Sequence, residues 1–208
     1  MNRKILAAAI TTCLILILAG CSGQTPDGQN TPEANADSIP IAIISVQDYG
    51  DITVELDATQ APETVQNFIE LAQDGFYDGL TFHRIITGFM IQGGDPNHNG
   101  TGGSETNIKG EFASNGVENN ISHKRGVISM ARAQDPDSAS SQFFIVHQDS
   151  DFLDGEYAAF GHVTNGMDIV DKICEDATPI DDNGTIEFEN QPVITTITIT
   201  NQNEAEGC

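Results

Sequence analysis

One stretch of the chain places an arginine among apolar and amide side chains at the spacing of β-strands. It runs from Phe82 to Asp95 and reads FHRIITGFMIQGGD. Side chains alternate across a strand, so Phe82 and Arg84 are expected on one face. Met90 and Gln92 are expected on one face of the next strand, after a Thr-Gly turn. A cation among Phe and Met, beside amides and without a carboxylate close to it in sequence, favours a peptide-binding site over a hydrolytic one.

A second segment repeats this combination of apolar and amide side chains. Ser141 to Ile145 reads SQFFI, and strand spacing puts Gln142 and Phe144 on one side. A long stretch rich in Gly and Asn, residues 96–109, is expected to be a loop, and its length favours a functional role over a mere connection. The candidate site therefore draws on more than one strand.

The elements that must position these residues follow from the periodicity of the whole chain. Pro62 and Glu63 suit the first turn of a helix, and apolar residues then recur at helical spacing until Gly75. A second helix is predicted over residues 167–174, and a turn over 181–184. Many short strands without β-α-β alternation favour an all-β fold, a closed antiparallel barrel capped by the two α-helices. The predicted strands are residues 41–45, 52–56, 81–86, 89–92, 126–131, 142–146, 158–163 and 193–200.

The first 20 residues have the pattern of a signal peptide. Two bases, Arg3 and Lys4, precede an apolar run over residues 5–18, which is short for a membrane span of roughly 20 residues. Residues 18–21 read LAGC and resemble the lipobox of bacterial and archaeal lipoproteins, in which Cys21 would be acylated and become the mature N-terminus. The alternative is an ordinary signal peptide cut near Gly20.

The remaining chain divides into a linker, one domain and a tail. Residues 21–40 are mostly small and polar, so they are expected to be a flexible linker that carries the lipid. Residues 41–201 have the length of one domain with a substantial core, and residues 202–208 form a C-terminal tail. This organisation predicts an extracytoplasmic protein that is anchored to a membrane through lipid on Cys21.

The chain is strongly acidic. Its formal net charge is −23, and removal of the signal peptide with its two bases would leave 31 acids against six bases, or −25. Such a surface repels nucleic acid and anionic lipid headgroups, so neither is an expected partner. Two interpretations of the charge remain open: adaptation to high salt, which screens the repulsion between carboxylates, or simply an acidic extracytoplasmic protein.

The cysteines leave one question open. Cys174 and Cys208 could form a disulfide in an exported protein, or Cys174 could simply be packed on its helix. No CxxC pair and no His/Cys cluster with ligand spacing occurs in the chain, so no metal site is predicted.

Six motifs resemble, in order and spacing, those of the cyclophilins. They read FHRII, GFMIQGGD, NGTGG, SMA, SQFFI and FLDG, and the resemblance extends over residues 41–200. It implies an eight-stranded barrel with a helix at each end, and cis/trans isomerisation of peptidyl-prolyl bonds without a cofactor or metal. The expected partners are proline-containing polypeptides, such as unfolded or exported proteins, and the expected state is a monomer.

The implied reaction explains why an arginine is useful. The barrier to rotation about an X-Pro amide is about 18–20 kcal/mol, and in the twisted state the prolyl nitrogen can accept a hydrogen bond. A fixed, always protonated donor therefore stabilises the transition state selectively. By resemblance, Arg84 is that donor, and Gln92 and Phe89 complete the catalytic set. The resemblance also implies ten substrate-binding residues: Met90, Gly100, Ala131, Arg132, Ala133, Gln142, Phe144, Phe152, Leu153 and Tyr157.

The chain departs from the best-studied cyclophilins at three positions of the site. Phe152 stands where they have tryptophan, which weakens the expectation of tight cyclosporin binding. Tyr157 stands where many have histidine, and Arg132 replaces a commoner asparagine, whose side chain matters less than its backbone. No catalytic role is expected for any histidine, and His83 is predicted to be buried, hydrogen-bonded and directed away from Arg84.

Three functions from different classes are compatible with these observations. The first is a surface-anchored prolyl isomerase that assists the folding of exported proteins. The second is a non-enzymatic module that uses the same pocket to hold proline-bearing segments. The third is a solute-binding lipoprotein of a transporter, but that class needs a larger, two-lobed chain. The apolar and amide set around Arg84 favours the first.

Overall fold

The computed structural model describes residues 39–201, so the predictions for the signal peptide, Cys21, most of the linker, the tail and Cys208 lie outside the described residues. Three single-turn 3-10 helices, which the sequence did not predict, lie in the loops. No helix of the described part is long and apolar enough to cross a membrane. The regular elements are β1 Pro40–Val46, β2 Gly50–Leu56, α1 Pro62–Gln73, β3 Phe82–Ile86, β4 Met90–Gly93, β5 Val127–Met130, β6 Phe143–Val146, β7 Ala159–Asn165, α2 Met167–Asp176 and β8 Ile194–Asn201.

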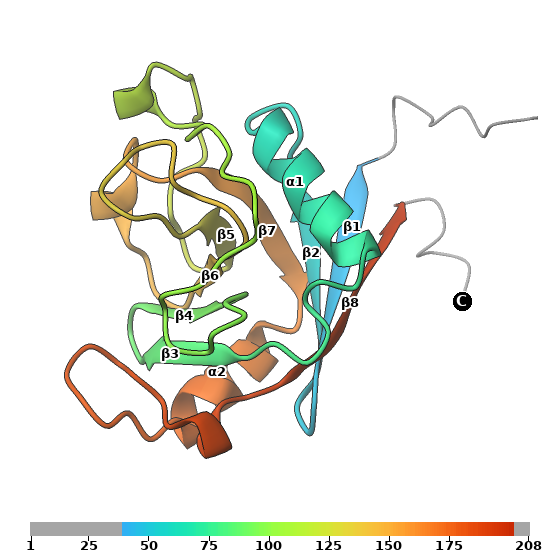
Figure 1. The fold of residues 1–208 in the computed structure, drawn as a ribbon, viewed down its shortest axis with the longest axis vertical. Helices are drawn as coiled ribbons and strands as arrows, with labels where there is room; N and C mark the ends of the chain where they lie inside the picture. The colour runs from blue at the N-terminus through green and yellow to red at the C-terminus, as the bar shows by residue number, and fades with distance from the viewer. Residues whose placement is uncertain (1–38, 202–208) are drawn as a thin grey trace, which may run out of the picture. The chain divides into compact units, whose positions relative to one another are not determined.

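The eight strands form one sheet in the order β3-β4-β6-β5-β7-β2-β1-β8, and every paired neighbour is antiparallel. The sheet curls around its core, with α1 toward one end and α2 toward the other in the view of Figure 1. The predicted all-β class, antiparallel pairing and two helices are therefore confirmed, and each predicted strand and helix matches an observed one within two residues at either end.

The prediction of a closed barrel is not confirmed. β3 and β8 are the two ends of the sheet, and a single bridge between Thr81 and Val193 joins them. The Phe82 amide donates to the Pro192 carbonyl at 2.9 Å, but proline has no N–H with which to return the bond. A ladder therefore cannot continue there, and the curled sheet remains open.

The outer edge of β3 is covered by the loop between α2 and β8. The Ile85 amide donates to the Gly184 carbonyl at 2.8 Å, and the Ile186 amide donates to the His83 carbonyl at 3.0 Å. Gly184 has φ +82°, and a Cβ there would collide with the side chain of Ile86, so glycine is required. This pairing shields an otherwise free sheet edge and brings the loop next to Arg84.

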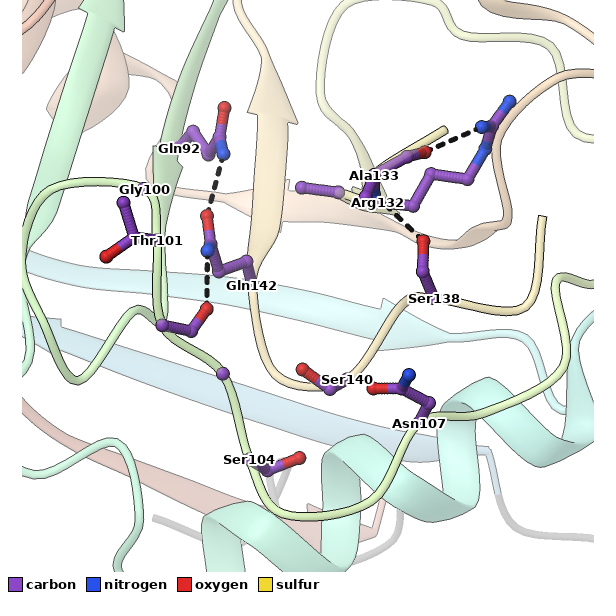
Figure 2. A pocket seen from close by; sticks show the side chains of 13 residues that line it. Gln92, Gly100, Thr101, Ser104, Asn107, Arg132, Ala133, Ser138, Ser140 and Gln142 are labelled. Atoms are coloured by element: carbon purple, nitrogen blue, oxygen red, sulfur yellow. Dashed lines mark hydrogen bonds between the residues drawn. The ribbon is translucent and has the colours of Figure 1, made fainter. Parts of the chain in front are cut away.

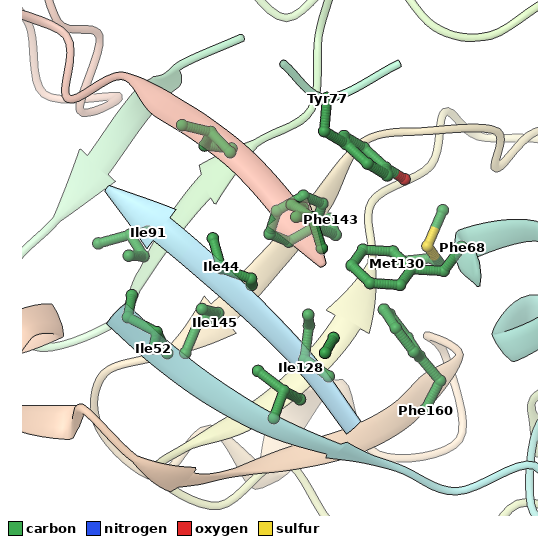
Figure 3. Packing of buried hydrophobic residues seen from close by; sticks show 14 of the residues in the cluster. Ile44, Ile52, Phe68, Tyr77, Ile91, Ile128, Met130, Phe143, Ile145 and Phe160 are labelled. Carbon is green, nitrogen blue, oxygen red and sulfur yellow. The ribbon is translucent and has the colours of Figure 1, made fainter. Parts of the chain in front are cut away.

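The core inside the curled sheet is built around a group of aromatic rings (Figure 3). Phe68 of helix α1 is fully buried and contacts Tyr77, Phe143 and Phe160 at centroid distances of 5.2–5.5 Å. Isoleucines from five strands, Ile44, Ile52, Ile91, Ile128 and Ile145, extend the core beside these rings. On α2, Cys174 is buried, as in the alternative that it is simply packed. Burial raises the pKa of its thiol to about 12.

Helix α1 has no cap from its own sequence. Its N-cap residue is Ala61, and the first orphan N–H groups are satisfied instead by Glu111, which is 5% exposed. The Glu111 carboxylate accepts from the Glu63 amide at 3.1 Å, from the Thr64 amide at 2.8 Å and from the Thr64 hydroxyl at 2.7 Å. A distant residue thus fixes the helix that carries Phe68.

Replacement of Glu111 by alanine is expected to lower the free energy of unfolding by about 2–4 kcal/mol, because several buried donors lose their acceptor. Urea titration followed by circular dichroism measures the change. Glu187→Ala, at an exposed carboxylate, is the matched control and should change stability by less than about 0.5 kcal/mol. Equal effects of the two substitutions would contradict the capping role.

Candidate active site

A bulge in β3 decides where Arg84 points. Phe82 pairs with Gly93 and Arg84 pairs with Gln92, so His83 is the extra residue between them. Phe82 consequently packs in the main core, whereas Arg84 faces Met90 and Gln92 on the other side of the sheet. The prediction that Phe82 and Arg84 share a face was wrong for this reason. The prediction that Met90 and Gln92 lie on the same face of their strand is confirmed.

The guanidinium of Arg84 is held from two sides. Nη1 donates to Oε1 of Gln92 at 3.1 Å and lies 3.8 Å from the sulfur of Met90. Nε donates to the carbonyl of Asn183 at 2.7 Å. Burial lowers the pKa of Arg84 below its usual value, but arginine titrates so high that the group stays charged. Its hydrogen bonds to the described residues use Nε and Nη1, so Nη2 keeps its donors for a ligand.

A series of hydrogen-bonded side-chain amides extends from Arg84 along the sheet. Nε2 of Gln92 donates to Oε1 of Gln142 at 2.9 Å, and Nε2 of Gln142 donates to the carbonyl of Gly102 at 2.7 Å (Figure 2). Gln142 and Phe144 also lie on one side, because Phe144 pairs with Gln92. This series of hydrogen bonds fixes the orientation of Gln92 and connects Arg84 to the 96–109 loop.

A hollow of about 310 Å³, here called the arginine pocket, lies in front of Arg84. Phe144 is 5% exposed and forms an edge contact with Tyr157 at 6.0 Å, while Phe152 is 72% exposed and lies 5.5 Å from the ring of Phe89. The pocket therefore has an apolar floor and one polar wall. It is lined by ten of the predicted site residues, Arg84, Phe89, Met90, Gln92, Ala131, Arg132, Phe144, Phe152, Leu153 and Tyr157.

A second hollow of about 360 Å³, here called the loop pocket, adjoins the first and shares Gln92, Ala131 and Arg132 with it (Figure 2). The three remaining predicted site residues, Gly100, Ala133 and Gln142, line it. Its other lining residues were not predicted from sequence, although the length of the 96–109 loop was a signal for the five of them that lie in that loop. The unpredicted lining residues are Thr101, Gly102, Gly103, Ser104, Asn107, Ser138 and Ser140.

The start of this loop is organised by a buried carboxylate. Asp95 is 0% exposed and accepts hydrogen bonds from the amides of Asn97 at 2.8 Å, Asn99 at 3.0 Å and Gly100. Burial by itself raises the pKa of Asp95, but the three amide donors and nearby His83 outweigh it, so the pKa lies below its usual value. Asp95 is therefore ionised at neutral pH and holds the loop beside the pocket.

The side chain of Arg132 contributes more than was expected. Its Nε and Nη2 donate to the carbonyl of Glu156 at 3.0 and 2.9 Å. Its guanidinium carbon lies 4.8 Å from the ring centroid of Tyr157 and 5.1 Å from that of Phe112. Arg132 thus supports Tyr157 in the pocket wall, in addition to any backbone role.

A buried histidine supports the pocket floor from behind. His123 is fully buried, stacks on Phe144 at 6.1 Å, and hydrogen-bonds Asp154 at 2.9 Å and the hydroxyl of Ser129 at 3.0 Å. These residue types occur in hydrolytic triads. Ser129 is also fully buried, so a substrate carbonyl cannot reach it and the arrangement is structural.

His83 differs from its prediction. It is buried at 3% exposure, but neither ring nitrogen has a hydrogen-bond partner among the described residues. The bulge places the ring beneath the loop, where a Cβ on Gly100 would lie 3.6 Å from Nε2. Burial lowers the pKa of His83, although Asp95 opposes the shift, so the ring is neutral at pH 7.

This burial predicts a loss of stability in mild acid. In the unfolded chain His83 titrates near pH 6.5, above its folded pKa, so below about pH 6.5 the unfolded state binds more protons and the free energy of unfolding falls. Burial also lowers the pKa of His123, so this residue likewise reduces the free energy of unfolding as the pH falls. Urea unfolding at pH 7.5 and 5.5 measures the loss. In His83→Met the loss should be smaller by up to about 1 kcal/mol, and an unchanged loss would contradict the assignment to His83.

Comparison with known proteins identifies the family to which this chain belongs. Residues 41–203 match the cyclophilin type peptidyl-prolyl cis-trans isomerase/CLD family. The chain is a cyclophilin-type peptidyl-prolyl cis-trans isomerase. This membership favours the isomerase among the three functional classes considered from sequence.

Several relatives share the domain with this isomerase. It is 48% identical over 126 residues to a peptidyl-prolyl cis-trans isomerase of Helicobacter pylori strain J99, which covers 60% of this chain and 75% of the relative. It is 37% identical over 184 residues to peptidyl-prolyl cis-trans isomerase A of Dickeya dadantii, which covers 84% of this chain and 86% of the relative. A crystal structure of a Cryptosporidium parvum cyclophilin, obtained with the dipeptide Ala-Pro, superimposes with a TM-score of 0.68 at 32% identity, over 77% of this chain and 98% of that one.

No group of three or more His, Cys, Asp or Glu side chains that could hold a metal ion occurs in residues 39–201.

Proposed function

We propose that Arg84 is the donor that stabilises the twisted prolyl amide. The observation that carries this proposal is the half-buried guanidinium, which lines the arginine pocket and is held by Gln92 and Asn183 through Nη1 and Nε, so that Nη2 keeps its donors for a substrate. In this proposal the proline ring lies against Phe144 and Leu153, and the prolyl nitrogen accepts a hydrogen bond from the donor beside it only when the amide is twisted. No proton needs to be removed, so no carboxylate is required next to Arg84.

The rest of the substrate would lie along the two adjoining pockets. In this proposal Phe89, Met90 and Leu153 surround the proline ring, and Gln92 keeps Arg84 in place. The backbone of the flanking peptide would bind to Gln142 and to the loop pocket, which expose amide and hydroxyl groups. Proline-containing polypeptides are therefore the proposed substrates, and no cofactor takes part.

A peptide assay tests the proposed function. The rate of cis-to-trans isomerisation of a proline-containing peptide is measured with the mature chain at low and at high salt. Acceleration over the uncatalysed rate, which has a time constant of tens of seconds, is the expected result. The salt series also separates the two interpretations of the acidic surface, because a salt-adapted protein should be more active and more stable at high salt. No acceleration at either salt concentration would contradict the proposal.

The turn over residues 181–185, which holds Arg84 through the carbonyl of Asn183, should affect the rate of isomerisation. Asp181 organises this turn by accepting hydrogen bonds from the amides of Asn183 and Thr185, both at 3.0 Å, and Asn183 presents its carbonyl to Arg84. Replacement of Asp181 by alanine is expected to lower kcat/KM by about 3- to 10-fold, because the donor is less well oriented. Asp181→Asn keeps an acceptor and should recover most of the activity. Asp182→Ala, at an exposed neighbour, is the control, and an equal loss there would contradict the role of the turn.

The proposed setting is the outer side of a membrane, where the isomerase would assist the folding of exported proteins. The support is the sequence of residues 1–40: two bases, an apolar run, LAGC at residues 18–21 and a polar linker. Expression of the full chain in a host that processes lipoproteins, followed by mass spectrometry of the membrane fraction, tests it. Acylation at Cys21, lost together with membrane retention in Cys21→Ser, is expected. An unmodified Cys21 would point to ordinary signal cleavage.

A further inference from the structure

A third hollow of about 590 Å³ lies beside helix α1, at the far end of the 96–109 loop. It is here called the α1 groove. Its floor is apolar and consists of Leu71, Phe76 and Ile108. Ile108 is buried, and the other two are half-buried and pack against the main core, so the floor is part of the rigid fold.

The rim of the α1 groove is acidic. The carboxylates of Glu63, Glu70, Asp74 and Glu105 line it, and no lysine or arginine does. Within residues 39–201 none of these four forms an ion pair; Glu70 accepts a hydrogen bond from Gln66 at 2.7 Å, and Glu63 accepts one from the backbone of Lys109 at 3.2 Å. The rim therefore offers negative charge that the described fold does not neutralise.

The α1 groove continues the substrate surface. Ser104 lines both the loop pocket and the α1 groove. Figure 2 shows Ser104 and Asn107 on the part of the loop that passes helix α1. A polypeptide that leaves the loop pocket past Ser104 would therefore reach the α1 groove next.

An apolar floor with an acidic rim suits one type of side chain in particular. Lysine and arginine have long apolar stems that lie on apolar surface while their charged ends stay in water. On this surface the stems would cover Leu71 and Phe76 and the ends would meet the carboxylates of Glu70 and Asp74. Other occupants fit poorly: residues 22–38 and 202–208 carry acids and no bases, and a second copy of so acidic a chain would be repelled.

We propose that the α1 groove is an accessory subsite for a lysine- or arginine-bearing segment of the same polypeptide whose proline occupies the arginine pocket. The inference rests on the proposed function and extends it, because it names basic client segments as preferred substrates. Attraction between an acidic rim and a basic segment also speeds encounter at low ionic strength, so the preference should depend on salt.

Peptides of matched length test the proposal. Each contains one proline and a block of lysine, glutamine or glutamate residues three to six positions away, on the N-terminal or the C-terminal side, which covers about 10–20 Å of extended chain. The proteins are the wild type, Glu70→Gln/Asp74→Asn at the groove and Glu175→Gln/Glu189→Gln as a control with the same change in net charge at exposed sites. Both kcat/KM and the dissociation constant from calorimetry are measured.

We expect the wild type to prefer the lysine peptide over the glutamine peptide by about fivefold, both in kcat/KM and in affinity, when the block lies on one particular side of the proline. This is the effect expected of one or two exposed ion pairs. The groove variant should reduce it to below about twofold, the control variant should retain it, and 1 M salt should abolish it. Equal reduction in both variants would mean that net charge alone attracts the peptide, and would overturn the subsite, as would the absence of any lysine preference. Turnover of the glutamine peptide reports separately on the proposed function, and calorimetry decides on the subsite even if turnover is absent.

Discussion

Replacement of Arg84 by alanine is expected to lower kcat/KM for a proline peptide by about 100- to 1,000-fold. Removal of one well-placed donor from a preorganised site costs about 2.7–4 kcal/mol of transition-state stabilisation, and among the described residues Arg84 is the one arginine that hydrogen-bonds Gln92. A protease-free isomerisation assay with a chromogenic peptide measures the loss. Arg84→Lys should lose nearly as much, because an ammonium cannot contact Gln92 and Asn183 while still donating to the substrate.

Two controls separate this effect from a change in charge or fold. Arg125→Ala removes an arginine that pairs with Asp171 at 2.8 Å, away from the pocket, and should leave kcat/KM within about twofold of the wild type. Urea unfolding of the Arg84 variants should show stability close to that of the wild type. A variant that folds normally and keeps full activity would exclude Arg84 as the donor.

Replacement of Phe68 by alanine is expected to lower the free energy of unfolding by about 3–5 kcal/mol, which for a domain of this size is about 6–20 °C in Tm. Phe68 is fully buried at the centre of the aromatic group that joins helix α1 to the sheet. Truncation removes three ring contacts and leaves a cavity that Tyr77 and Phe160 cannot fill without leaving their own positions. Differential scanning calorimetry and urea titration measure the change.

An exposed aromatic provides the comparison. Phe188→Ala removes a ring that is 60% exposed and contacts His98 at 5.0 Å, and should cost less than about 1 kcal/mol. If the two substitutions were equally destabilising, the aromatic group around Phe68 would not be the centre of the core.

The elements that could be predicted from sequence are those whose residues obey a local period. The strands and both helices follow from apolar spacing, and the clustering of the candidate site residues in two adjoining pockets follows from the ordered motifs. The closed barrel was not predictable in the same way. Closure depends on whether the last strand can pair with β3, and one proline, Pro192, prevents a continuous ladder there.

The remaining differences come from single residues that act at a distance. The bulge at His83 reverses the face expected for Phe82, and strict alternation cannot reveal a bulge. Helix α1 has alanine as its own N-cap residue, and Glu111 caps it by binding the amides of Glu63 and Thr64, which lie 48 and 47 positions earlier in the sequence. Asn183 reaches Arg84 only because its loop folds back along β3. The contacts of Glu111 and Asn183 join segments far apart in the chain, which local periodicity cannot reveal.

In the proposed mechanism Arg84 stabilises the twisted amide and contributes little to binding of the planar one. NMR exchange spectroscopy on a proline peptide measures both the dissociation constant and the rate of isomerisation on the enzyme, for the wild type and for Arg84→Lys. For Arg84→Lys we expect a dissociation constant within about threefold of that of the wild type and an on-enzyme rate lower by about 100-fold or more. A variant that binds the peptide about 100-fold more weakly but isomerises the bound peptide at the wild-type rate would contradict this mechanism.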